Sequence, residues 1–382
     1  MARRLQRLAV PGLLIVFMWL PLGQGWFARG PAPEAKTSSP SAADSLVPTT
    51  TAAHPPVTGP SPGEALPSVA PAPGARAPAA SSLTSRFGMG LLIADRGNGR
   101  LLIVSDAKRI LWRFPGTGSL PRGQRFSADD AFVSPDRRTI VANDEQHQVI
   151  DRIDIATRRV VWQYGHYDRS GAGAGYLHTP DDAYPLANGD IVVADIRNCR
   201  ILEINPAKQI VRRWGQAGSC SHRPPFTFNN PNGDTPLSDG GLLITEIGGS
   251  RVVRLDARGK VMFDIHVPVR YPSDAQLDAN GNVLVVDYSN PGAVLRIGPR
   301  GRVLWRYRAG HGPARLNHPS LAIPLPDGTV ALNDDFRARV IVIDPRTNRI
   351  VWQYGQTDGQ GRTAGHLFIP DGIDLVPLGT HL

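Results

Sequence analysis

The sequence predicts an all-β protein, a six-bladed β-propeller closed by its C-terminal strand and preceded by an N-terminal signal or anchor and a disordered Pro-rich linker. Three observations predict the propeller. From Leu91 onward, short Val-, Ile- and Leu-rich runs alternate with Gly, Asn, Asp and Pro turns, without a convincing helical pattern. Residues 162–182 and 352–372 share eleven residues at identical offsets, which indicates an internal repeat. One large aromatic residue closes each unit at intervals of 42 to 52 residues: Trp112, Trp162, Trp214, Phe263, Trp305 and Trp352.

The N-terminal segment, residues 1–29, has the features of an export signal. Three arginines precede an apolar run at residues 8–22, which is shorter than the roughly 20 residues of a spanning helix. No clear cleavage site follows, so a cleaved signal peptide and a retained membrane anchor both stay open. We expect the rest of the chain to be extracytoplasmic in either case.

A spacer is predicted at residues 30–85, which consist largely of Pro, Ala, Ser and Thr. Such a segment buries too little apolar surface to offset its chain entropy, so we expect it to be disordered. The net charge of +9 does not indicate nucleic-acid binding, because the cations of residues 91–382 are scattered and nearly balanced, 35 Lys and Arg against 30 Asp and Glu.

The propeller itself is assigned to residues 86–382. Residues 182–214 show a complete unit, with strands expected at 182–186, 191–195, 200–204 and 209–214 separated by Asn-Gly and Asn-Pro turns. The first unit lacks its innermost strand, whereas residues 370–376 have the pattern of such a strand with no blade after them. The C-terminus is therefore expected to complete blade 1 and close the ring. We expect the protein to be a monomer.

The repeated units resemble known propeller families. The pattern Asp-Gly-Asn, hydrophobic run, Asp-x-x-Asn-x-Arg-Ile resembles an NHL-type repeat, and the closing Val-Trp-Gln-Tyr-Gly resembles blades of PQQ-binding-like and arylsulfotransferase-like propellers. The resemblance implies the fold but not the function, because these superfamilies include enzymes, receptors and scaffolds. The adjacent-cysteine pair of quinoprotein dehydrogenases is absent, and six blades is fewer than their usual eight, so we do not expect bound PQQ.

Polar residues are expected to gather at one mouth of the central channel, where the loops between blades emerge. Their oxygens could bind a ligand or a hard cation such as Ca²⁺. For the second-strand residues we favour a structural role, because Asp95, Asp195 and Glu246 each precede an Arg by five residues across a hairpin. The candidates for ligand binding begin the first strands: Asp129, Asp181, Asn229, Ser273, Ser320 and Asp371. The candidates for metal binding end the second strands: Asp95, Asp195, Glu246 and Asp287.

No common catalytic motif occurs in the sequence. We therefore favour a binding or scaffold propeller that presents a His- and Asp-rich face to a small-molecule ligand or an envelope protein. The alternative is an enzyme resembling NHL-type lyases or arylsulfotransferases, which would use His178 or His318 with Arg223 or Arg315 on an anionic small molecule.

The two cysteines of the chain, Cys199 and Cys220, are expected to form a disulfide. Both fall in segments predicted to lie on the same face of the propeller, and an exported protein meets an oxidising environment.

Overall fold

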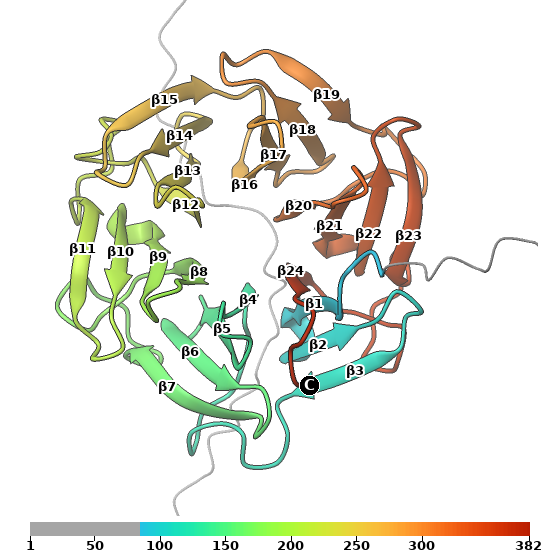
Figure 1. Ribbon diagram of the computed structural model, residues 1–382, viewed down its shortest axis with the longest axis horizontal. Helices are drawn as coiled ribbons and strands as arrows, with labels where there is room; N and C mark the ends of the chain where they lie inside the picture. Colours follow the sequence, from blue (N-terminus) through green and yellow to red (C-terminus); the bar gives the residue numbers. More distant parts are fainter. Residues whose placement is uncertain (1–84) are drawn as a thin grey trace, which may run out of the picture. The chain divides into compact units, whose positions relative to one another are not determined.

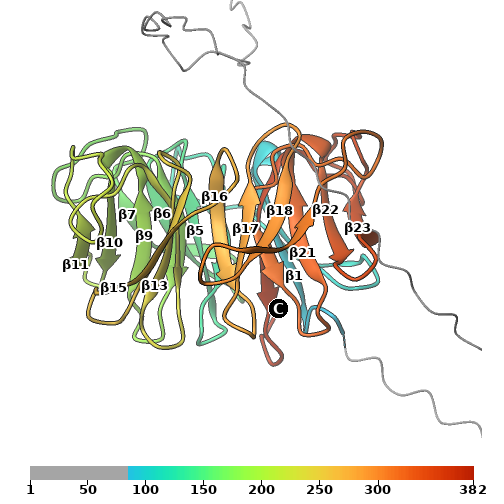
Figure 2. The same cartoon turned by 90° about the horizontal axis from the view of Figure 1, so that it is seen from above.

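Six four-stranded antiparallel sheets form a closed ring around a central channel (Figure 1). The computed structural model describes residues 85–382, so the predicted signal or anchor and the linker lie outside the described residues. The side view shows the strands running from one face of the disc to the other (Figure 2). Within the described part of the chain, no helix is long and apolar enough to cross a membrane.

The first three blades follow one another around the ring, and the strands of each blade are named from the innermost outward. Blade 1 consists of β24 (Pro370–Val376), β1 (Gly90–Asp95), β2 (Arg100–Val104) and β3 (Ile110–Phe114). Blade 2 consists of β4 (Ala131–Val133), β5 (Thr139–Asp144), β6 (Val149–Asp154) and β7 (Arg159–Gly165). Blade 3 consists of β8 (Pro180–Pro185), β9 (Ile191–Asp195), β10 (Arg200–Ile204) and β11 (Ile210–Gly215).

The other three blades complete the ring in the same order. Blade 4 consists of β12 (Pro231–Pro236), β13 (Leu242–Glu246), β14 (Arg251–Leu255) and β15 (Val261–His266). Blade 5 consists of β16 (Pro272–Leu277), β17 (Val283–Asp287), β18 (Ala293–Ile297) and β19 (Val303–Tyr307). Blade 6 consists of β20 (Ala322–Pro324), β21 (Val330–Asp334), β22 (Arg339–Asp344) and β23 (Arg349–Gly355). Short 3₁₀ turns link the second and third strands of blades 1, 3 and 6: η1 (Arg96–Asn98), η2 (Ile196–Asn198) and η3 (Asp335–Arg337).

The C-terminal strand closes the ring, as the sequence predicts. β24 pairs antiparallel with β1, with Ile93 opposite Ile373 and Gly90 opposite Val376. The first and last strands of the described chain therefore share one sheet, and the pairing removes two exposed sheet edges.

The blades pack against one another through apolar layers, and the repeated tryptophans tie them together. Trp112 is 1% exposed and lies among residues of blades 1 and 2. The indole groups of four tryptophans donate a hydrogen bond to a turn of the following blade, which satisfies the polar edge of each ring. These bonds join Trp112 to the Ile155 carbonyl (2.9 Å), Trp162 to the Pro206 carbonyl (2.9 Å), Trp305 to the Asn348 side chain (2.8 Å) and Trp352 to the Asp106 carbonyl (2.9 Å).

The innermost strands of four blades are irregular where they face the channel. The pairing register shifts between Asp181 and Tyr184 in β8, and Asp182 has a left-handed φ of 47°. Equivalent shifts occur near the starts of β12, β16 and β24. A bulge of this kind re-aims side chains, so two consecutive residues of one strand can line the channel.

Candidate functional site: an acidic cavity in the channel

A cavity of about 160 Å³ lies in the central channel, and most of its polar lining is acidic. Seven carboxylates line it, and of the described residues at its wall Arg96 alone is cationic. Tyr271, Tyr288, Asn232 and two serines complete the wall. The carboxylates belong to Asp129, Asp130, Glu145, Asp181, Asp182, Asp274 and Asp371.

The mouth of the cavity is organised by Arg96, which lies in η1. Its guanidinium contacts Asp129 at 2.5 Å, Asp371 at 2.6 Å and Glu145 at 3.1 Å. Burial lowers the pKa of Arg96, but the charges of these three carboxylates outweigh burial and raise it overall. One guanidinium thus joins blade 1, through η1 and β24, to two segments of blade 2.

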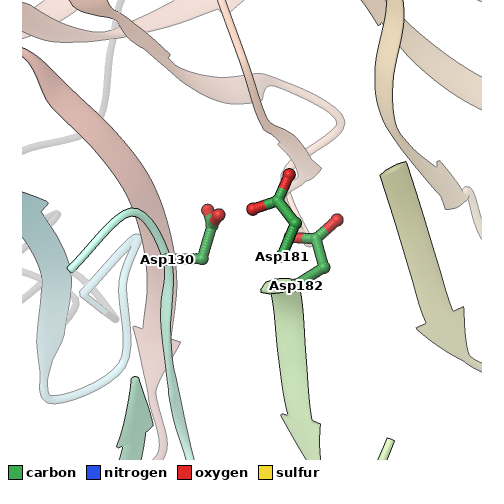
Figure 3. A group of neighbouring side chains, drawn as sticks. All are labelled: Asp130, Asp181 and Asp182. Carbon is green, nitrogen blue, oxygen red and sulfur yellow. The ribbon is translucent and has the colours of Figure 1, made fainter. Parts of the chain in front are cut away.

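A second group of carboxylates lines the same cavity. Asp130 precedes β4, and Asp181 and Asp182 lie at the start of β8 (Figure 3). One oxygen from each of the three carboxylates lies within 4.8 Å of the others. Asp274 of β16 lines the same cavity and is 2% exposed.

Burial and mutual repulsion oppose ionisation of these groups. Burial, followed by the charge of Glu145, raises the pKa of Asp181 to about 7. Burial raises the pKa of Asp274 to about 6, although hydrogen bonds from Gln276 and Ala275 lower it. Burial together with neighbouring aspartates raises the pKa of Asp130 and of Asp182 well above the usual range. Positive charge brought into the cavity would therefore be strongly favoured.

Comparison with known proteins agrees with the repeat pattern. Residues 209–371 match the family described as outer membrane protein assembly factor BamB. The protein is a propeller with PQQ-like repeats. The resemblance to PQQ-binding-like propellers is thereby confirmed. No curated protein sequence matches this PQQ-like propeller significantly.

Solved structures similar to the PQQ-like propeller agree on its fold. A protein of unknown function from Bacteroides caccae is 18% identical, with a TM-score of 0.53, over 74% of this chain and 97% of that one. A chain of the nidogen/laminin complex is 15% identical, with a TM-score of 0.52, over 74% and 97% of the two chains. A catalytically inactive virginiamycin B lyase from Staphylococcus aureus with quinupristin is 16% identical, with a TM-score of 0.42, over 59% and 70%. At these identities the first two matches show the fold alone.

Five of the six residues predicted at the channel mouth of this PQQ-like propeller line the cavity, and Asn229 does not. Asn229 is absent from this cavity wall because β12 begins at Pro231, so Asn232 occupies the corresponding place. Asn229 lies in the loop before the strand, where its main-chain N–H donates to Glu246. The five that line the cavity are Asp129, Asp181, Ser273, Ser320 and Asp371.

The four predicted metal candidates lie in four different blades and do not form one site. Each accepts a main-chain hydrogen bond from the loop entering its blade. Asp95 and Asp195 also bind Arg100 and Arg200, at 2.6 and 2.7 Å. Arg251 pairs with Asp264 instead of with Glu246, which contacts His222. Asp287 receives main-chain N–H groups of Arg270 and Tyr271.

The predicted catalytic candidates are not brought together. His178 enters blade 3 and His318 enters blade 6, on opposite sides of the six-bladed ring (Figure 1). Arg223 lies over the ring of Phe226 in the loop leaving blade 3, and Arg315 bonds to Asn290. His318 stacks edge-on with Tyr288 and Phe336. None of the four lines the acidic cavity.

Cys199 and Cys220 form a disulfide that anchors the loop between blades 3 and 4. The same loop carries His222, whose ring contacts Glu246 through Nδ1 and Asp264 at 2.8 Å through Nε2. The loop is therefore fixed to blade 3 by a covalent bond and to blade 4 by an ionisable side chain.

Sequence reasoning missed most of the carboxylates in the second group. Asp130, Asp182 and Asp274 each directly follow a residue that was predicted at the mouth. The adjacent pairs Asp129-Asp130 and Asp181-Asp182 were the available signal. Neighbouring residues of a regular strand point to opposite faces, so the pattern does not predict that both members of a pair line the channel.

Proposed function

We propose that this protein is a non-catalytic binding propeller that holds a positively charged group of a ligand or partner in its acidic channel cavity. The observation that carries this proposal is the charge of the wall, seven carboxylates against one arginine. Charges of one sign in a cleft with low-dielectric walls focus the electrostatic potential and raise the local concentration of oppositely charged ligands.

The form of the cavity favours a small cationic group. Its volume of about 160 Å³ suits the charged end of a ligand better than a large ligand as a whole. Tyr271 and Tyr288 contribute aromatic rings to the same wall, and such rings attract ammonium and guanidinium groups. Arg96 already shows how this wall holds a guanidinium, through carboxylates of two blades.

The alternative, an enzyme acting on an anionic small molecule, has less support. An anion would be repelled from the acidic cavity, and His178, His318, Arg223 and Arg315 do not converge there. We also propose that the propeller acts outside the cytoplasm as an envelope protein. The support is the charged and apolar N-terminal segment, the Cys199–Cys220 disulfide and the match to a family named for an outer-membrane assembly factor.

Calorimetric titration of the full-length protein with spermidine and agmatine tests the binding proposal. Both amines should bind, with an affinity that falls as the salt concentration rises. Glu145→Gln should weaken binding because it removes one negative charge at the mouth, whereas Asp136→Asn, an exposed carboxylate in the β4–β5 turn, should not. Absence of binding by both amines, or equal binding by Glu145→Gln, would overturn the proposal. Turnover of an aryl sulfate that is lost in His178→Ala would instead support the enzyme.

A further inference from the structure

We infer that the acidic cavity contains a metal site, in which Asp130, Asp181 and Asp182 bind one divalent cation of the Ca²⁺ type. This inference deepens the proposed function and rests on it, because it names a metal ion as a cation that the acidic cavity holds. The site differs from the predicted metal candidates, which end the second strands of separate blades.

The spacing of the carboxylates suits a large, hard cation. Their three oxygens lie within 4.8 Å of one another. Ca²⁺ binds oxygen at about 2.3–2.6 Å, so its ligands can be up to about 5 Å apart, whereas Mg²⁺ at about 2.0–2.1 Å requires a tighter octahedron. The lining of carboxylate, amide and hydroxyl oxygens, with no His or Cys in it, also favours Ca²⁺ over Zn²⁺.

Unpartnered oxygens point independently to a missing ligand. Oδ2 of Asp182 accepts no hydrogen bond although the residue is 2% exposed. Both carboxylate oxygens of Asp234 in β12 are also unpartnered at 0% exposure. Burial and the charges of Asp181 and Asp274 raise the pKa of Asp234 well above its usual range, so it belongs to the same electrostatic group. Buried polar atoms are nearly always paired, and a cation bound by Asp182 would give its Oδ2 a partner.

Protein cations do not neutralise this group. Arg96 is engaged by Asp129, Asp371 and Glu145 at the mouth. Among the described residues, no Lys, Arg or His forms an ion pair with Asp130, Asp182, Asp234 or Asp274. Asp181 accepts hydrogen bonds from the amides of Asn232 at 2.5 Å and Asn143 at 3.3 Å, and its remaining hydrogen-bond partner is the carboxyl group of Asp130, not a cation.

Two glycines leave room for the carboxylates. A Cβ atom at Gly372 of β24 would lie 2.4 Å from Oδ1 of Asp130 and 2.7 Å from its Cα. A Cβ atom at Gly233 of β12 would lie 3.0 Å from Oδ1 of Asp274. Any larger residue at Gly372 would therefore displace Asp130 from its place beside Asp181.

The competing explanation is that shared protons, not a metal, hold the carboxylates together. Carboxyl groups at hydrogen-bonding distance can share a proton when burial raises their pKa values. The two explanations differ in their response to chelation at neutral pH and in the effect of a single Asp→Asn substitution.

The test measures the melting temperature of full-length protein after EDTA treatment, with and without millimolar Ca²⁺ at neutral pH, and the metal content of the protein as isolated. Ca²⁺ should raise the melting temperature of the wild type by several degrees, because an ion that binds only the native state stabilises it. Asp182→Asn should lose this shift. Its melting temperature in EDTA should equal or exceed that of the wild type, because an uncharged amide avoids the cost of placing a further carboxylate among the buried aspartates, which also shows that the variant folds. Asp151→Asn is the matched control, a buried carboxylate of β6 outside the cavity that should keep the full shift.

The inference is overturned if Ca²⁺ leaves the wild-type melting temperature unchanged and the isolated protein contains no metal, or if Asp182→Asn keeps the wild-type shift. The amine titrations separate this result from failure of the proposed function. Binding of spermidine without Ca²⁺ overturns the metal site alone. Binding of Ca²⁺ without either amine supports the metal site and overturns the organic-cation proposal, and binding of none overturns both.

Discussion

Arg200 donates from Nε to Oδ2 of Asp195 at 2.7 Å, across the turn that joins the second and third strands of blade 3. The other oxygen of Asp195 accepts the main-chain N–H of His178. One buried carboxylate therefore fixes both a hairpin and the loop that enters the same blade. The pair recurs in blades 1 and 6, as Arg100 with Asp95 and Arg339 with Asp334.

Replacing Arg200 by Met should lower the free energy of unfolding by about 3–5 kcal/mol, because it leaves Asp195 buried without its cation. Denaturant unfolding measures this loss. Binding of Ca²⁺ and amines by the folded variant should be unchanged, since Asp195 does not line the cavity. A stable Arg200→Met variant that binds no cation would show that the pair belongs to the site.

Removal of the disulfide should destabilise the loop between blades 3 and 4. The bond joins residues 21 positions apart, so Cys199→Ser with Cys220→Ser should cost about 3 kcal/mol by the chain-entropy estimate. His222→Gln should act on the same loop by removing its contacts with Glu246 and Asp264. Alkylation of the unreduced, denatured protein measures the bond itself, and two reactive thiols would contradict it.

The free energy of unfolding in EDTA should fall as the pH rises from about 4 to 7, because buried carboxyl groups such as that of Asp151 have a raised pKa. Burial raises the pKa of Asp151 to about 7 from an ordinary value of 3.8. Between these values the folded state retains a proton that the unfolded state releases, so this contribution is complete below pH 3.8 and lost above pH 7. Across this range the free energy of unfolding of the wild type should fall relative to that of Asp151→Asn. A constant difference would contradict the raised pKa.

Ending the chain before β24 should prevent folding of the propeller. The truncated protein would lose the pairing of β24 with β1 and, with Asp371, one carboxylate that holds Arg96. Circular dichroism and proteolysis should show loss of cooperative β-structure, because blade 1 would expose an unpaired edge beside the channel. A truncated chain that melts like the wild type would show that closure is dispensable.

Trp352→Phe is a milder change at the same closure. It removes one hydrogen bond to Asp106 and should lower the free energy of unfolding by about 1 kcal/mol.

The internal repeat was sufficient to predict the six-bladed architecture. The irregular pairing of the innermost strands made some of the cavity residues unpredictable. The spacing of Trp162 and Trp352 and the orphan strand pattern at residues 370–376 were sufficient for six blades and their closure. Most residues of the channel mouth could be placed by analogy between blades. Asn229 is displaced by three residues, because the Pro-x pair that begins the first strand is Pro231-Asn232 in blade 4, as it is Pro180-Asp181 in blade 3.

The carboxylates of the second group depend on backbone geometry that no residue pattern specifies. In a regular strand Asp182 would point away from the side occupied by Asp181, but the register shift in β8 places both at the cavity. Arg96, Glu145, Tyr271 and Tyr288 come from turns and loops, and the arrangement of the assembled ring brings them to one wall. A single sequence does not specify which residues of different blades lie close together in the assembled ring.

A crystal structure of the protein grown with millimolar Ca²⁺ would show directly whether the acidic cavity holds a metal ion. If the cavity holds Ca²⁺, a density peak should appear in the channel, bound by oxygens of Asp130, Asp181 and Asp182 at about 2.4 Å. Carboxylates in hydrogen-bonding contact with one another, with neither a metal nor an organic cation between them, would contradict the proposed cation site.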